Sequence, residues 1–143
     1  MEKKYRIGYT QGVFDMFHIG HLNLLIHAKE QCDYLIVGVN SDELVKEYKN
    51  KTPVIREEDR RTIIENIKCV DRAVIAHTLD KLKAWNDYHF DAIFIGSDWI
   101  GNSRWEETGK QLKEVGAELV YLPHTDGISS TMLREDVDQK AEE

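Results

Sequence analysis

The chain has little cysteine, no long apolar run and no excess of positive charge. Its 143 residues include two cysteines, Cys32 and Cys69, each alone in an apolar setting. They form no CxxC pair, so we expect both to be reduced and buried, as in a cytoplasmic protein. No apolar stretch approaches the ~18–20 residues that cross a membrane. The charged residues 1–6 lack the apolar core of a secretion signal, and we expect no membrane association.

The charge balance limits the classes of partner. A formal net charge of −7 disfavours general binding of nucleic acid. Residues 46–68 are nevertheless locally basic, which favours a small anionic ligand over a polyanion. With 41% hydrophobic and 31% charged residues, the composition is that of a globular protein. The length predicts a single domain over 1–143, which ends in an acidic tail at 135–143.

Strand-like and helix-like patterns alternate along the chain. Short apolar runs predict strands at 7–10, 34–39, 73–76, 92–95 and 119–122. Amphipathic or capped segments predict helices at 20–31, from Ser41 onward, at 57–67, 79–88 and 105–115, and from Ser129 onward. This alternation predicts a Rossmann-like, doubly wound α/β fold, in which a five-stranded parallel sheet has helices on both faces. Such sheets bind ligands beyond the carboxyl ends of their strands.

The first polar cluster follows the first strand, over residues 12–21. Gly12 and Gly20 would let a ligand approach the backbone, and the start of a helix presents unpaired N–H groups that suit phosphate. His18 and His21 lie three residues apart in the first helical turn, where two imidazoles can donate hydrogen bonds to phosphate oxygens, most strongly when protonated. The alternatives are two surface histidines or a metal pair, although no further ligands are spaced nearby.

Two more clusters follow later strands. The basic stretch contains Lys49, Lys51, Arg56, Arg60 and Lys68; its lysines could reach an anion, or it could be a solvated, salt-bridged helix face. Residues 123–134 combine a glycine, Gly127, with three hydroxyl side chains at a helix start and Arg134 one turn later. This third cluster is either a second phosphate-binding helix start or an ordinary helix cap.

These motifs together resemble the small bacterial cytidylyltransferases, most closely those that act on glycerol 3-phosphate. The likeness covers residues 5–138 and also extends to the catalytic domains of choline- and ethanolamine-phosphate cytidylyltransferases. It rests on the H-x-G-H motif of His18 to His21, on segments 12–15, 33–39 and 70–71, on Gly96 to Trp99 and on Gly127 to Thr131. H-x-G-H alone marks the wider nucleotidyltransferase superfamily, and the combination is more specific.

The resemblance implies an activity and a set of roles. CMP would pass from CTP to a phosphorylated small molecule, most closely glycerol 3-phosphate, with release of pyrophosphate. His18, His21, Lys49 and Arg134 would serve catalysis, and Lys49, Lys51 and Lys81 would bind the acceptor. The nucleotide would be bound by Gly12, Val13, Phe14, Asp15, His18, Gly20, His21, Arg60, Lys68, Asp98, Trp99, His124, Thr125, Gly127, Ile128, Ser129, Ser130 and Thr131.

Cofactor, assembly and alternatives follow from the same likeness. We expect Mg²⁺ on the triphosphate, held mostly by phosphate oxygens and water, with Asp15 assisting. A homodimer is expected because the family commonly dimerises. His124 stands where the glycerol-type motif has arginine, and Ile128 to Arg134 also resembles an adenylyltransferase motif. The alternatives are therefore another phosphorylated acceptor (an aminoalcohol, polyol or capsule-precursor phosphate), an ATP-using adenylyltransferase, or a nucleotide-binding module without turnover.

Overall fold

A computed structural model describes residues 3–123, which form alternating strands and helices. The elements are β1 (Tyr5–Gly12), α1 (Ile19–Glu30), β2 (Cys32–Asn40), α2 (Asp42–Lys49), α3 (Glu57–Glu65), β3 (Arg72–Ala76), α4 (Lys81–Tyr88), β4 (Ala92–Gly96), the 3₁₀ turn η1 (Ser97–Trp99), α5 (Ser103–Glu114) and β5 (Glu118–Leu122). Every element predicted within these residues is present. The predicted helix from Ser129 and the acidic tail lie outside the described residues.

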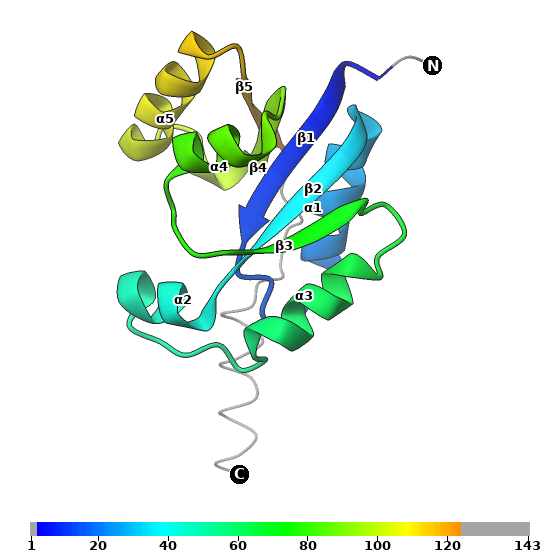
Figure 1. Ribbon diagram of the computed structural model, residues 1–143, viewed down its shortest axis with the longest axis vertical. Helices are drawn as coiled ribbons and strands as arrows, with labels where there is room; N and C mark the ends of the chain where they lie inside the picture. Colours follow the sequence, from blue (N-terminus) through cyan, green and yellow to red (C-terminus); the bar gives the residue numbers. More distant parts are fainter. Residues whose placement is uncertain (1–2, 124–143) are drawn as a thin grey trace.

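The five described strands form one parallel sheet in the order β3-β2-β1-β4-β5. The predicted doubly wound fold is confirmed. The chain moves outward from β1 through β2 to β3, then returns to the other side of β1 to form β4 and β5 (Figure 1). The direction of winding therefore reverses between β1 and β4. In such sheets a crevice opens at the carboxyl ends of the two strands that flank this reversal.

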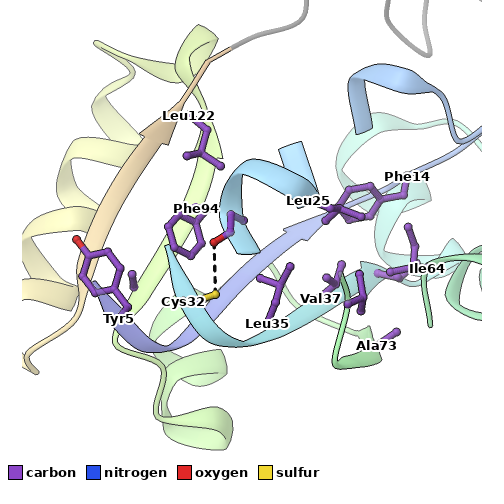
Figure 2. Packing of buried hydrophobic residues seen from close by; sticks show 14 residues of the cluster. Tyr5, Phe14, Leu25, Cys32, Leu35, Val37, Ile64, Ala73, Phe94 and Leu122 are labelled. Atoms are coloured by element: carbon purple, nitrogen blue, oxygen red, sulfur yellow. Dashed lines mark hydrogen bonds between the residues drawn. The ribbon is translucent and has the colours of Figure 1, made fainter. Parts of the chain in front are cut away.

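The sheet is covered on both faces because its strands alternate their apolar side chains between two clusters. In β2, Leu35 and Val37 pack with residues of α1 and α3, such as Leu25 and Ile64. Figure 2 shows this cluster between the helices and the sheet. Ile36 points to the opposite cluster, which α4 and α5 complete. Burial on both faces explains why the sequence of β2 is almost continuously apolar.

Side-chain caps fix where several helices begin. The Ser41 hydroxyl accepts a hydrogen bond from the Leu44 N–H at 3.1 Å, which confirms the predicted cap of α2. Asp80 caps α4, so that helix begins at Lys81 and not at the predicted residue 79. Asn102 caps α5, which begins at Ser103, two residues before the predicted start. No helix among residues 3–123 is long and apolar enough to cross a membrane.

Core side chains pack closely against Gly8, which gives a test of this packing. A Cβ atom there would lie 2.6 Å from Cε2 of Phe94 and 2.7 Å from Sγ of Cys32, both in the core. We expect Gly8→Ala to lower the free energy of unfolding by about 1–3 kcal/mol, measured by urea titration. The control is Gly109→Ala inside α5, where a Cβ would meet the end of the Leu119 side chain at 3.2 Å and helix propensity improves. Equal losses in both variants would contradict this packing.

Candidate active site

A cleft of about 720 Å³ opens at the carboxyl ends of β1 and β4, where the winding reverses. Its walls come from the loop after β1, the start of α1, the end of α2 and the residues that follow it, the start of α4, and the segment from Gly96 into α5. The predicted position of a ligand site is therefore a real concavity. Most of the candidate residues within 3–123 line it: Gly12, Val13, Phe14, Asp15, His18, Gly20, His21, Lys49, Lys51, Lys81, Asp98 and Trp99.

The loop between β1 and α1 is held in an unusual conformation. Phe14 and Met16 have φ angles of 53° and 50°, a region that side-chain-bearing residues seldom adopt. The Phe14 ring is buried in the core beside Leu25 and Ile64 (Figure 2). Burial of this ring offsets the cost of the backbone strain, and such strained residues often cluster at functional sites. The Phe14 ring therefore anchors the loop in the core. The resemblance did not indicate this role.

His18 and His21 cap the helix that they begin. The Gly20 N–H donates to Nδ1 of His18 at 3.0 Å, and the His18 N–H donates to Nδ1 of His21 at 3.3 Å. The two rings stack with their centroids 3.8 Å apart. Because each Nδ1 accepts a hydrogen bond, the ring proton of the neutral form sits on Nε2. Nε2 of His18 is buried and has no hydrogen-bond partner among the described residues.

The site keeps both imidazoles neutral. Burial lowers the pKa of His18. Burial and the neighbouring His18 ring lower the pKa of His21 to about 4, although Asp15 acts in the opposite direction. The protonated form, in which an imidazole binds phosphate most strongly, is therefore disfavoured in the free protein. A neutral ring with its proton on Nε2 still donates one hydrogen bond, so the His18 side chain can bind a phosphate oxygen without carrying a charge.

Asp15 ties the loop after β1 to the segment before α3. Its Oδ2 accepts from the Val54 N–H and its Oδ1 from the Ile55 N–H, both at 2.8 Å. Both carboxylate oxygens thus serve backbone groups, which fits an anchor better than a magnesium ligand. Among residues 3–123, no group of three His, Cys, Asp or Glu side chains could hold a metal ion. The described residues therefore do not form a protein cage for Mg²⁺.

Arg60 lies behind the cleft and does not line it. Its exposed fraction is 1%, and its guanidinium donates to the carbonyls of Ile55, Val13 and Asn40 at 2.7–2.8 Å. It also pairs with Asp42 at 2.6 Å. Arg60 thus binds the backbone of the loop that carries Val13, and its predicted direct role at the nucleotide is replaced by a positioning role.

The lysines of the basic stretch separate into two groups. Lys49 and Lys51 line the cleft, as predicted. Partial burial and the charge of Lys51 lower the pKa of Lys49, while Asp15 opposes the shift. Arg56 instead pairs with Asp59 on the surface. Lys68 is exposed, lies before β3 and so near the amino ends of the parallel strands, and does not line the cleft at their carboxyl ends. The structure therefore does not support the prediction that Lys68 serves the nucleotide site.

Asp98 and Trp99 lie in the 3₁₀ turn that follows β4. Oδ1 of Asp98 folds back toward Gly96, where a Cβ atom would lie 2.5 Å away, so a larger residue there would displace the Asp98 carboxylate. Trp99 is 46% exposed, and its ring centroid is 6.4 Å from that of Trp105. This turn offers an acid and an open aromatic face on the β4 side of the cleft. The third predicted cluster, with His124, Thr125, Gly127 to Thr131 and Arg134, lies outside the described residues.

Sequence reasoning missed two groups at the cleft. Gln11, at the end of β1, accepts from the Tyr9 hydroxyl at 2.6 Å and donates to Oδ1 of Asn40 at 2.9 Å. Asn40 in turn donates to the Tyr48 hydroxyl at 3.1 Å. Gln11 and Asn40 are polar residues at the ends of two buried strands, and this pattern could have indicated the network from the sequence.

The second missed group is Arg104, in the first turn of α5. Nothing in the sequence around Arg104 indicates a binding residue.

Comparison with known proteins agrees with this geometry. Residues 9–136 match the family described as cytidylyltransferase-like. The chain belongs to the cytidylyltransferase-like family. It is 38% identical to glycerol-3-phosphate cytidylyltransferase from Bacillus spizizenii, over 90% of this chain and 94% of the relative. The same-named protein from Bacillus subtilis is 36% identical with the same coverage. A bifunctional protein HldE from Hyphomonas neptunium is 33% identical over 90% of this chain and 26% of its own.

Solved structures show the same fold. The lipopolysaccharide core biosynthesis protein from Thermoplasma volcanium matches with a TM-score of 0.74 and 27% identity, over 85% of this chain and 99% of its own. A pantoate-beta-alanine ligase from Francisella tularensis has a TM-score of 0.64 and 13% identity, over 96% of this chain and 71% of its own. At that identity the ligase supports the fold alone. The predicted family and fold are confirmed.

The lowered pKa of His21 predicts a loss of stability in acid. The folded pKa of about 4 lies below the ordinary value of 6.5, so the unfolded chain takes up the proton first as the pH falls. This contribution is complete above pH 6.5 and is lost toward pH 4, by at most about 3 kcal/mol. The measurement is urea unfolding at stepped pH. His21→Asn keeps an acceptor for the His18 N–H and should lose less stability over this range; identical pH profiles would contradict the assignment.

The bonds of Arg60 predict a large effect of its removal. Arg60→Met leaves three buried or part-buried carbonyls and the Asp42 carboxylate without their donor, so we expect a loss of about 3 kcal/mol in the free energy of unfolding. The control is the neighbouring Arg61→Met, which removes a partly exposed i,i+4 pair with Glu65 and should cost less than about 0.5 kcal/mol. Calorimetry or urea unfolding measures both. Similar stability of the two variants would show that Arg60 does not hold these segments together.

Proposed function

We propose that this protein transfers CMP from CTP to glycerol 3-phosphate, which yields CDP-glycerol and pyrophosphate. The names of the two Bacillus relatives supply the substrates of this proposal. The observation that carries it is the buried Nε2 donor of His18, which has no partner among the described residues and belongs to a cleft-lining side chain at a helix start. A buried donor of this kind calls for an acceptor from a ligand, and a phosphate oxygen at a helix N-terminus satisfies it.

The reaction needs no nucleophile from the protein. A phosphate oxygen of the acceptor attacks the α-phosphorus of CTP, the bond from that phosphorus to the bridging oxygen breaks, and pyrophosphate leaves with the electron pair. The acceptor oxygen is already ionised at neutral pH, so no strong general base is required. Catalysis then consists of holding the two reactants in line and stabilising charge in the transition state.

Different described residues would hold the reactants in line and stabilise charge. His18 and His21 would donate hydrogen bonds to oxygens of the triphosphate, where charge shifts during the transfer. Lys49, Lys51 and Lys81 line the same cleft and would neutralise the repulsion between two anionic reactants. Trp99 and Asp98 would contact the nucleoside.

In this proposal Mg²⁺ would bind together with the nucleotide. Mg²⁺ would lower the negative charge of the triphosphate, with phosphate oxygens and water as its ligands. Asp15 holds the backbone of Val54 and Ile55 with one hydrogen bond on each carboxylate oxygen, and its assistance to the metal stays a prediction. The homodimer and a role in making envelope or capsule precursors also stay predictions that rest on the resemblance.

The direct test is pyrophosphate release with CTP or ATP, each combined with glycerol 3-phosphate or with other phosphorylated acceptors. We expect turnover with CTP and glycerol 3-phosphate and little with ATP. Turnover with CTP and another acceptor would keep the chemistry and change the acceptor. A preference for ATP would overturn the assignment of the base, and no release with any pair would overturn the function.

A matched pair of variants tests the role of His18. His18→Asn retains an oxygen near the position of Nδ1, so it can still cap α1, but it removes the Nε2 donor. We expect its unfolding free energy to change by less than about 1 kcal/mol and its kcat to fall by a factor of about 100 or more. His18→Gln places an amide near Nε2 and should retain more turnover. Normal kcat in the asparagine variant would remove His18 from the mechanism.

A further inference from the structure

Two cations lie in the first turns of neighbouring helices at the cleft, and neither forms an ion pair with a carboxylate among the described residues. Lys81 is the first residue of α4 and is 8% exposed; its Nζ donates to the Leu79 carbonyl at 2.8 Å. Arg104 is the second residue of α5. Both line the cleft. Within residues 3–123 the structure gives neither of them an ion pair with a carboxylate.

The two charges lie close enough to affect each other. Burial, and after it the charge of Arg104, lowers the pKa of Lys81 to about 8, while Asp80 opposes the shift. Nζ of Lys81 also lies 5.3 Å from the centroid of the Trp105 ring. The first turns of α4 and α5 thus bring an ammonium, a guanidinium and an indole to one wall of the cleft.

This arrangement works against stability. The N-terminal end of a helix carries partial positive charge, so a cation in the first turn is unfavourable. A buried ammonium without a carboxylate partner adds a desolvation cost. Both costs fall when an anion binds between the two side chains. The geometry therefore points to an absent anionic ligand and not to a structural role.

We propose that Arg104 is a specificity-determining residue that, together with Lys81, binds the phosphate of the acceptor. The resemblance placed Lys81 near the acceptor but assigned nothing to Arg104. The guanidinium can donate two parallel hydrogen bonds to a phosphomonoester, which favours this group over a carboxylate or a neutral alcohol. This inference rests on the proposed function, because it takes the acceptor to be a phosphomonoester.

The position of the pair assigns it to the acceptor and not to the nucleotide. The helix start that carries His18 and His21 belongs to α1, which packs on one face of the sheet. Lys81 and Arg104 come from α4 and α5, which pack on the opposite face. An in-line transfer places the attacking oxygen and the leaving pyrophosphate on opposite sides of the α-phosphorus. The α1 wall of the cleft would then face the leaving pyrophosphate, and the wall from α4 and α5 would face the attacking oxygen of the acceptor.

Steady-state kinetics of Arg104→Gln separate the two substrates. We expect the KM for glycerol 3-phosphate to rise by about 10 to 100-fold and the KM for CTP to change less than about twofold. The control is Lys110→Gln on α5, a residue that does not line the cleft, with both KM values unchanged. A rise in the KM for CTP alone would assign the pair to the nucleotide, and unchanged KM values would show that Arg104 binds neither; either result overturns the proposal.

Thermal unfolding separates binding from folding. Because the cation opposes the helix dipole, Arg104→Gln should have a Tm equal to or above that of the unmodified protein. Lys81→Met keeps the length of the side chain, removes the buried charge and should also not lower the Tm, while the KM for the acceptor rises. A drop in Tm in both variants, together with unchanged acceptor binding, would mean that these cations serve the fold, and would overturn the proposal.

A binding measurement keeps this test independent of turnover. Inorganic phosphate and glycerol 3-phosphate are titrated while tryptophan fluorescence is followed, since Trp105 lies beside Lys81. We expect saturable changes that require at least tenfold more ligand in Arg104→Gln and that are smaller in amplitude in Trp105→Phe, in which Trp99 still lines the cleft. Saturable phosphate binding without turnover on any acceptor would reject the proposed function and leave the anion site standing. Normal turnover and normal phosphate binding in Arg104→Gln would reject this inference alone.

Discussion

One buried guanidinium connects three segments beside the cleft. Arg60 extends from α3 and donates to the carbonyls of Val13, Asn40 and Ile55, which belong to the loop after β1, the end of β2 and the segment before α3. Asp15 adds a second connection between the first and third of these segments. With both connections in place, the loop that begins at Gly12 keeps its strained conformation and presents His18 at the start of α1. The protein's own contacts therefore hold this part of the site in place.

The electrostatic character of the cleft follows from the absence of carboxylates paired with its cations among the described residues. Burial lowers the pKa of both imidazoles, and Lys81 and Arg104 form no ion pair with a carboxylate among the described residues. Such an arrangement lowers the stability of the free protein and favours ligands that carry several negative charges. A triphosphate and a phosphomonoester are ligands of this kind. Neutral histidines add directional hydrogen bonds to this field, and they do so without further repulsion between buried cations.

The fold was predictable because its signals are local. Apolar runs marked all five described strands, and the polar cluster after β1 marked one of the two strands at which the winding reverses. The predicted strand 7–10 extends to Tyr5–Gly12, because the backbone of β2 pairs with residues at both ends whatever their side chains are. Ser41 was identified as a cap because its side chain has a known preference for that position.

The roles within the site were less predictable because they depend on distant contacts. Nothing in the local sequence distinguishes Arg60, which turns inward to three carbonyls, from Arg61, which stays near the surface. Lys68 sits in the same basic stretch, yet the course of the chain carries it to the amino end of β3, away from the cleft. The use of Asp15 as a backbone anchor and of His18 as a helix cap was not predictable either, since each partner is set by how the loop closes.

The central claim is that this cleft positions two anionic reactants and that no side chain attacks phosphorus. The most direct test is the configuration at the α-phosphorus after transfer from a CTP analogue with one sulfur at that position and defined stereochemistry, read by ³¹P NMR of the product. A single in-line displacement predicts inversion. Retention would mean two successive displacements with a covalent nucleotidyl-enzyme between them, and would contradict this account.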